Sequence, residues 1–362
     1  MPDTAWHYAV VVGIDQYPAI DNGRYDLSCP LLDAQRMEDW LTSKQGGNID
    51  PARVKVLTRS IPKGRNPPVP VFDEINKAIL ECAEDFVDRR KQQLSSEAAR
   101  KAAWQTSRLY LYISGHGMDG DGDDAVLITA NATRSSMNHI STRNVVNRLK
   151  TGKVFAELIV LADCCRDLSG VNVQDLPWDL RNYMGYNDPI LPRTFIAYAS
   201  RNRKKAFEVP SGAAIQNSIF TQALLEGLGG GVSGTCVESR NLERFLYNYV
   251  PKLAEQYKLP DQNPEIRADP DIVFWQNSKS YQLELTAKAG SAFDGLPSVD
   301  VVEMEKGVVH SRVTLNATAP NVFKGTLPTG FYAAVPTGGD PMTGAPVSAF
   351  SVLGKDTNER IG

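Results

Sequence analysis

A histidine and a cysteine, each placed just behind a short apolar run, are the residues of this chain best suited to do chemistry. His116 follows the run from Arg108 to Ile113, and Cys165 follows the run from Glu157 to Leu161. Runs of this length, rich in Val, Ile, Leu and Tyr, are typical of buried parallel strands. Reactive groups in open parallel sheets gather beyond the carboxyl ends of the strands, so we expect the two side chains to meet there.

A cysteine beside a histidine suits nucleophilic catalysis. The thiol becomes a strong nucleophile only as the thiolate, which a neighbouring imidazole promotes. The same imidazole can protonate a departing amine, and the oxyanion formed on the way needs fixed N–H donors. A residue as small as Gly117 lets its backbone N–H approach such an oxyanion. The plainer interpretation, in which His116 and Cys165 merely end their strands, stands beside this one.

The motifs around these two residues resemble those of caspases, and more closely those of the metacaspase-like branch. The histidine lies in the motif SGHG at residues 114–117, and Cys165 ends a D-x-C motif that begins at Asp163. The histidine precedes the cysteine by 49 residues, close to the gap of about 50 that caspases show. Arg166 falls where caspases have an arginine after their cysteine, whereas Asp167 departs from the usual Gly or Ser.

This resemblance, which covers roughly residues 6–275, implies a cysteine endopeptidase with named catalytic residues. His116 is then the catalytic histidine, and Cys165 is the nucleophile that forms an acyl intermediate. The backbone N–H groups of Gly117 and Cys165 are implied to stabilise the oxyanion. Cys164, the first of the two adjacent cysteines, is expected to turn into the core.

The resemblance also implies a preference for the residue before the cleaved bond, the P1 residue. In metacaspases two aspartates build a pocket for a basic P1 residue, and these correspond to Asp163 and Asp33. Ser200 is expected as a further substrate-binding residue. Animal caspases instead place arginines around this pocket and cleave after Asp. For Asp33 there is a second interpretation, as an acidic residue in the first turn of a helix, where the helix dipole favours it.

The order of predicted elements indicates an α/β protein. By resemblance to caspases, its strands form a mostly parallel six-stranded sheet flanked by helices. Apolar runs predict those strands at residues 8–14, 54–57, 108–113, 125–129, 157–161 and 194–199. Amphipathic periodicity predicts helices that start near residue 31 and at residues 72–90, 143–150, 218–228 and 241–257. Thr142 is expected to cap the third of these, residues 91–103 to extend the second into solvent, and Gly229 to Gly231 to end the fourth.

The chain changes character after Pro260. Prolines and a polar run at residues 276–280 indicate a linker, and the remainder has no helical period. Short strands expected at residues 281–286, 299–302, 309–315, 331–335 and 347–352 are typical of a small antiparallel β-sandwich. We therefore expect a peptidase domain at residues 1–277 and a β-rich accessory domain at residues 278–362.

The bulk composition argues against several classes of protein. A net charge of −3 gives no reason to expect a nucleic-acid partner. The 5 cysteines are too few and too scattered for a disulfide framework, and without a C-x-x-C pair structural zinc is not expected. No run approaches 18 apolar residues and the start lacks a cleavable signal, so we expect a cytoplasmic protein with no membrane partner.

The loop from Asp119 to Asp124 is rich in aspartate, and its oxygen atoms would suit Ca²⁺. It lacks the twelve-residue EF-hand pattern and the glutamate that ends it. A solvated turn is the favoured interpretation, and no cofactor is expected to be required.

Two further loops bear on control of the activity. The loop from Asp167 to Pro192 is a candidate for self-cleavage, because Arg181 and Arg193 offer basic P1 positions. The basic loop from Arg201 to Lys205, with the C-terminal region, is expected to form or support a regulatory site for a phosphate-bearing ligand.

By resemblance, bacterial caspase-like proteases act in stress or antiphage responses, where a partner protein or a small nucleotide releases their activity on protein substrates. The rival expectation is a catalytically silent scaffold whose C-terminal domain recognises a ligand.

Overall fold

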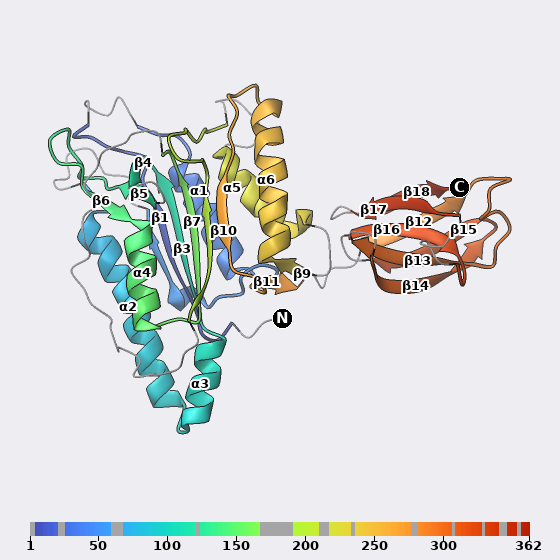
Figure 1. Ribbon diagram of the computed structural model, residues 1–362, viewed down its shortest axis with the longest axis horizontal. Helices are drawn as coiled ribbons and strands as arrows, with labels where there is room; N and C mark the ends of the chain where they lie inside the picture. The colour runs from blue at the N-terminus through green and yellow to red at the C-terminus, as the bar shows by residue number, and fades with distance from the viewer. Residues whose placement is uncertain are drawn as a thin grey trace. The chain divides into compact units, whose positions relative to one another are not determined.

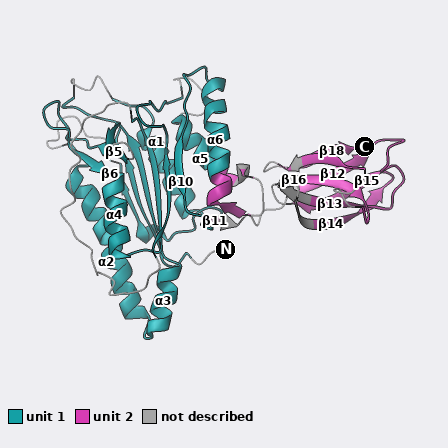
Figure 2. Ribbon diagram, viewed as in Figure 1, with its two compact units in different colours: residues 1–225, 243–272 teal, residues 226–242, 273–362 magenta. Residues whose placement is uncertain are grey.

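The computed structural model describes residues 4–20, 26–58, 68–120, 124–166, 191–209, 217–232, 236–276, 281–305, 308–327, 330–339, 346–352 and 356–362. The chain forms two compact units, shown in Figures 1 and 2. The first comprises Met1–Leu225 with Glu243–Ile272, and the second Glu226–Leu242 with Val273–Gly362. The domain boundary expected after residue 277 falls outside the described residues.

The first unit is built on a six-stranded sheet with the order β10-β8-β7-β3-β1-β2. Each neighbouring pair is parallel except β10 and β8, which are antiparallel. The mostly parallel six-stranded sheet expected from the sequence is confirmed. Its strands are β1 (His7–Gly13), β2 (Val54–Leu57), β3 (Arg108–Gly115), β7 (Glu157–Cys164), β8 (Arg193–Tyr198) and β10 (Glu265–Ala268).

One member of this sheet differs from the prediction. The segment expected as its fourth strand forms β5 (Asp124–Ile128), which lies instead in a separate antiparallel sheet with β4 (Gly117–Gly120) and β6 (His139–Ser141). The sixth strand of the main sheet is instead β10, which lies in a stretch that we expected to be part of a linker. The four residues of β10, which lie in a stretch flanked by Pro264 and Pro270, are too few to show an alternating apolar pattern. Pairing with β8 is therefore what defines this strand.

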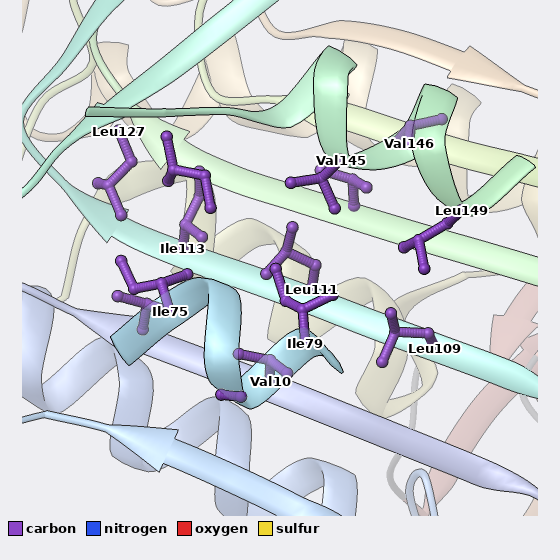
Figure 3. Close-up of a cluster of buried hydrophobic side chains, with 14 of the residues drawn as sticks. Val10, Ile75, Ile79, Leu109, Leu111, Ile113, Leu127, Val145, Val146 and Leu149 are labelled. Carbon is purple, nitrogen blue, oxygen red and sulfur yellow. The ribbon is translucent and has the colours of Figure 1, made fainter. Parts of the chain in front are cut away.

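Helices cover both faces of the sheet (Figure 1), which explains why its strands are continuous apolar runs. On one face, alternate residues of the strands such as Val10 and Leu111 pack against α2 and α4 (Figure 3). On the other face, Trp40 of α1 contacts Tyr110, with ring centroids 6.1 Å apart. The helices are α1 (Pro30–Thr42), α2 (Phe72–Gln93), α3 (Glu97–Gln105), α4 (Thr142–Gly152), α5 (Ile219–Glu226) and α6 (Ser239–Gln256).

Three details of the helices correct the sequence interpretation. The expected extension of α2 into solvent is a separate helix, α3, whose Trp104 is buried and donates its indole N–H to the carbonyl of Lys153 at 2.7 Å. The cap of α4 is Ser141, whose hydroxyl accepts the N–H of Asn144 at 3.0 Å, and not Thr142. The glycines after α5 do not stop the helix at Leu228, because a π-helical turn spans Gly227–Gly231.

The second unit is a small β structure with its own core. Its seven-stranded sheet has the order β17-β16-β13-β14-β15-β12-β18, antiparallel except for β12 and β18. The two end strands contact each other, so the sheet is nearly closed around buried side chains such as Leu285, Val299 and Phe323. The strands are β12 (Tyr281–Ala287), β13 (Ser298–Glu305), β14 (Val308–Ala319), β15 (Val322–Leu327), β16 (Gly330–Pro336), β17 (Ser348–Val352) and β18 (Thr357–Ile361).

The expected β-rich C-terminal part is thus confirmed, and the five predicted strands are present. The sequence missed β15 and β18. The three middle residues of β18 are exposed, which leaves no apolar run to identify it. A further short antiparallel pair joins β9 (Cys236–Glu238) and β11 (Val273–Gln276).

Candidate active site

The candidate site lies where β3 and β7 end. These strands are neighbours in the sheet and Gly115 pairs with Cys164, so the next residue of each, His116 and Cys165, leaves the sheet at the same edge. Both side chains line one pocket of about 60 Å³, together with Asp163. The structure therefore brings together the two residues that the sequence selected for catalysis.

The sulfur of Cys165 lies against the backbone of Ala206. The N–H of Ala206 donates to Sγ at 3.3 Å, and the carbonyl of the same residue is 3.6 Å from Sγ. Cys165 is half-buried at the edge of the pocket. The N–H can donate to a thiolate and the carbonyl can accept the proton of a neutral thiol, so these two contacts hold Sγ in place in either form.

Gly117 lies too close to Cys164 and Cys165 at the end of β7 to carry a side chain. A Cβ at this position would be 2.6 Å from the sulfur of Cys164 and 2.6 Å from the carbonyl oxygen of Cys165. Cys164 itself is 2% exposed and belongs to the hydrophobic core, as predicted. Burial raises the pKa of its thiol far above the ordinary value, which keeps it neutral and unreactive.

The two aspartates expected to recognise substrate lie buried beside each other at the start of α5. Asp33 accepts the N–H and the hydroxyl of Ser218, and Asp163 accepts the N–H of Thr221 at 3.0 Å and its hydroxyl at 2.6 Å. Asp33 does lie in the first turn of α1, as its second interpretation requires, but its carboxylate serves the start of a different helix. Asp163 and Ser218 line the pocket of His116 and Cys165.

Burial makes both of these carboxyl groups reluctant to ionise. It raises the pKa of Asp33 from 3.8 to about 8, and the negative charge of Asp163 adds to the effect. It raises the pKa of Asp163 to about 7, against the lowering effect of the hydrogen bonds from Thr221. Near neutral pH the pair therefore holds at least part of a proton that two exposed aspartates would have lost.

Besides Asp163, a second carboxylate lines the pocket: Glu208, which was not assigned a role from the sequence, whereas Asp33 does not line it. Oε1 of Glu208 accepts the backbone N–H groups of Ser28 at 2.9 Å and Cys29 at 2.8 Å, just before α1 begins. It lines the pocket and raises the pKa of Asp33. No sequence pattern described above pointed to this residue.

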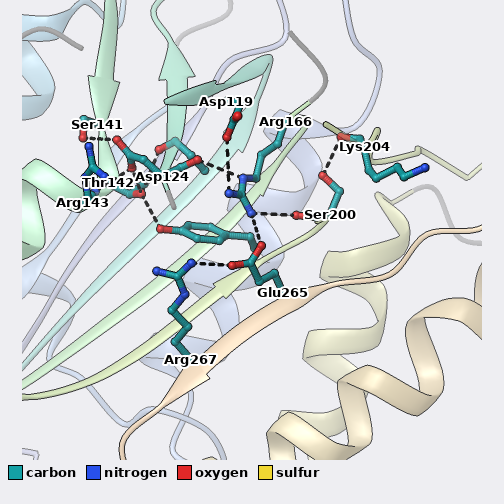
Figure 4. A network of polar contacts seen from close by, with 12 residues as sticks. Asp119, Asp124, Ser141, Thr142, Arg143, Arg166, Ser200, Lys204, Glu265 and Arg267 are labelled. Carbon is teal, nitrogen blue, oxygen red and sulfur yellow. Dashed lines mark hydrogen bonds and ion pairs between the residues drawn. The ribbon is translucent and has the colours of Figure 1, made fainter. Parts of the chain in front are cut away.

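Arg166, the residue after Cys165, is fully buried and connects the loop that contains His116 to the loop that contains Cys165 (Figure 4). Its guanidinium donates to Glu265 of β10 at 2.6 Å and to the carbonyl of Asp124 at 3.0 Å. It also pairs with Asp119 of β4 at 3.6 Å and lies over the ring of Tyr198. Since β4 directly follows His116, this one side chain connects the histidine loop to the cysteine loop.

The same contacts correct the interpretation of the aspartate-rich loop. Asp119 and Asp124 are 6% and 0% exposed, so these two ends of the loop are not a solvated turn. Asp124 accepts the hydroxyls of Ser141 and Thr142 and the N–H of Arg143. Residues 121–123 lie outside the described residues. In the described part of the chain, no three His, Cys, Asp or Glu side chains come together as a metal site requires.

Comparisons with known proteins identify the family of this domain. A sequence model of the caspase domain (Peptidase_C14) matches residues 7–270. The chain belongs to the caspase family. Among solved structures, one match is protein GSU0716 from Geobacter sulfurreducens, with 15% identity, coverage of 73% of this chain and 94% of that one, and a TM-score of 0.40. A comparison with curated proteins found no match.

Within this caspase-family domain, Ser200 does not line the pocket. It is fully buried, its hydroxyl donates to the carbonyl of Lys204 at 3.0 Å, and its own carbonyl lies 3.5 Å from the guanidinium of Arg166. The structure thus places it in the network that anchors the nucleophile's loop.

The two arginines proposed for self-cleavage differ in their settings. Arg193 begins β8, between β7 and β10, and its N–H donates to the carbonyl of Ala156 at 2.8 Å. A peptidase engages the free backbone of an extended segment, so cleavage here would require β8 to leave the sheet. Arg181 and the rest of residues 167–190 lie outside the described residues.

Across the described helices, none combines the length and apolar character needed to cross a membrane.

Proposed function

We propose that this caspase-family protein is a cysteine endopeptidase that cleaves proteins after Arg or Lys through a Cys165–His116 dyad. The observation that carries the proposal is the single pocket that holds His116, Cys165 and Asp163. It joins a nucleophile, a proton carrier and a buried acid at the end of neighbouring parallel strands, where α/β enzymes place their reactive groups.

In the proposed reaction, His116 accepts the thiol proton and Cys165 Sγ attacks the carbonyl carbon of the scissile bond. The tetrahedral intermediate collapses as the C–N bond breaks, and His116 gives the proton to the departing amine. A water molecule then attacks the acyl-Cys165 thioester while His116 takes its proton, and the C–S bond breaks to release the acid and restore the Cys165 sulfur. We assign the oxyanion to the backbone N–H groups of Gly117 and Cys165, two segments that lie close together at the end of β7.

The buried acids support the preference for a basic P1 residue. Asp33 and Asp163 raise each other's electrostatic energy, and in the described part of the chain no ion pair joins either to a cation. An arginine or lysine side chain would supply the missing positive charge and release the retained proton. An acidic P1 residue would add a further negative charge to the pocket.

The size of the pocket supports a gated enzyme. About 60 Å³ is far below the roughly 300 Å³ or more of a typical ligand site, so a P1 arginine cannot enter unless lining residues such as Phe207 move. We extend the proposal to a stress or antiphage effector that a partner protein or a small nucleotide activates. The exposed cations Arg201, Arg203 and Lys204 support a nucleotide as the activator, because they could bind its phosphate groups. The carbonyl of Lys204 accepts the N–H of Arg166, so this basic loop is bonded directly to the residue that follows Cys165.

The test compares Cys165→Ala with Cys164→Ala on fluorogenic peptides that differ only at P1. Cys165→Ala should lower kcat/KM for an arginine substrate at least about a thousandfold, since it removes the nucleophile. Cys164→Ala, the matched control, should keep most of the activity and lose only core packing. Equal losses from both folded variants would contradict the assignment.

Alkylation of Cys165 separates the enzyme from the silent scaffold. In the enzyme, the reaction of Cys165 with iodoacetamide depends on His116, whereas a scaffold shows no such dependence under any condition.

A further inference from the structure

Tyr17 is a fully buried aromatic residue that the proposed reaction does not use. It lies in the loop after β1, 0% exposed, and the backbone of this loop is fixed on both sides of the residue. The N–H of Tyr17 donates to Asp26 Oδ1 at 3.0 Å, and its carbonyl accepts the N–H of Ile20 at 3.0 Å. The side chain is therefore held in one place by its own segment.

This side chain makes two separate contacts with His116. The backbone N–H of His116 donates to the Tyr17 hydroxyl at 2.7 Å. The two rings also pack, with centroids 4.7 Å apart and planes tilted by 54°. The hydroxyl fixes the backbone of His116, and the ring restricts the rotation of the imidazole.

The surrounding backbone is shaped around the tyrosine hydroxyl. The carbonyl of His116 accepts the N–H of Ile128 at 2.9 Å, and the Tyr17 hydroxyl lies 3.5 Å from the carbonyl of Ile128. A Cβ on Gly115 would be 2.6 Å from the same hydroxyl, so only glycine leaves room for it. Burial raises the pKa of Tyr17 far above its ordinary value, so the hydroxyl stays protonated and can donate toward the carbonyl of Ile128 while it accepts the N–H of His116.

We propose that Tyr17 is a positioning residue that holds the imidazole of His116 toward Cys165. The inference rests on the proposed dyad and adds a residue to it. Reaction rates depend steeply on such placement, because proton transfer needs the two groups within hydrogen-bond reach. Tyr17 does not touch the substrate in this role, so it affects kcat and leaves substrate binding largely unchanged.

The experiment uses the full chain with Tyr17→Phe, which keeps the ring, and Tyr17→Leu, which removes both contacts. Tyr17→Phe should lower kcat about tenfold with KM within about twofold, and Tyr17→Leu should lower kcat about a hundredfold. The matched control is Tyr110→Phe. Tyr110 is equally buried, and its hydroxyl accepts a hydrogen bond from Arg108 at 2.8 Å in the same sheet. This control should lose similar thermal stability and keep its kcat.

The second readout is the pH profile for alkylation of Cys165 by iodoacetamide. In Tyr17→Phe the reactive thiolate should appear at higher pH than in the unaltered protein, because His116 stabilises it less. Unchanged kcat and an unchanged profile in Tyr17→Phe, at the same stability loss as Tyr110→Phe, would overturn the inference. If His116→Ala leaves the profile of the unaltered protein unchanged, the dyad itself fails, and the role of Tyr17 fails with it.

Discussion

The two ends of β7 each carry a buried carboxylate, and the difference between them separates structure from function. At the start of the strand, Glu157 pairs with Arg108 and Arg193, so its charge is compensated within the fold. At the end of the same strand, Asp163 is 4% exposed and faces the second acid Asp33. One carboxylate has two cations, and the other has a like-charged neighbour.

This contrast indicates which of the two buried carboxylates is suited to bind a cationic ligand. A buried charge that is fully paired gains nothing from an incoming group, whereas a buried acid held beside another acid is stabilised by any cation that reaches it. Asp163 lines the pocket of His116 and Cys165, so the cation can arrive as part of a substrate. Glu157 lies at the opposite end of β7, where it is paired in register with Arg108 at the start of β3.

The largest expected effect is a loss of folding stability when Glu157, the paired carboxylate at the start of β7, is replaced. Glu157→Gln removes the charge that compensates two arginines, one of them buried, and should lower the free energy of unfolding by about 3–5 kcal/mol. Chemical denaturation measures this value. The matched change at the other end, Asp163→Asn, should leave stability at pH 8 unchanged or raise it. Equal destabilisation by the two substitutions would remove the distinction between the two ends.

The next effect is the pH dependence of stability. Because the folded pKa values of Asp33 and Asp163 are raised to about 8 and about 7, the folded protein keeps protons that the unfolded chain loses above pH 3.8. Their contribution is full below that pH and is lost as the pH rises through 7 to 8. Stability should fall by about 1.4 kcal/mol per pH unit for each extra proton held.

Thermal unfolding between pH 5 and 8 measures this slope, with the double variant Asp33→Asn and Asp163→Asn as the control. The slope should flatten in the double variant. A slope that persists there would assign the dependence to other groups and leave this pair ionised.

The sequence was sufficient to predict the positions of residues that directly follow an apolar run. His116 and Cys165 could be paired because parallel strands end at one edge of a sheet, and the run that precedes each identifies its strand. Asp163 follows from the same strand. Residues of this kind take their positions from local pattern and one rule of topology.

Residues that reach the site from distant segments could not be predicted in this way. Glu208 meets the start of α1 across 180 residues of sequence, and Tyr17 meets His116 across 99. Nothing local to either residue indicates that contact. Similarly, β10 is defined by pairing with β8, and the burial of Asp119 and Asp124 depends on Arg166 and on the hydroxyls of residues 141–142.

The measurement that tests the central claim most directly compares P1 arginine with P1 citrulline, its neutral counterpart of similar shape. In the unaltered protein, kcat/KM for arginine should exceed that for citrulline by at least about tenfold, a difference of about 1.4 kcal/mol. In the double variant Asp33→Asn and Asp163→Asn this preference should disappear, because neither acid is left to carry the charge on which it depends. A preference for arginine that survives in the double variant, or equal cleavage of both substrates by the unaltered protein, would contradict the claim that the buried acids select a basic residue.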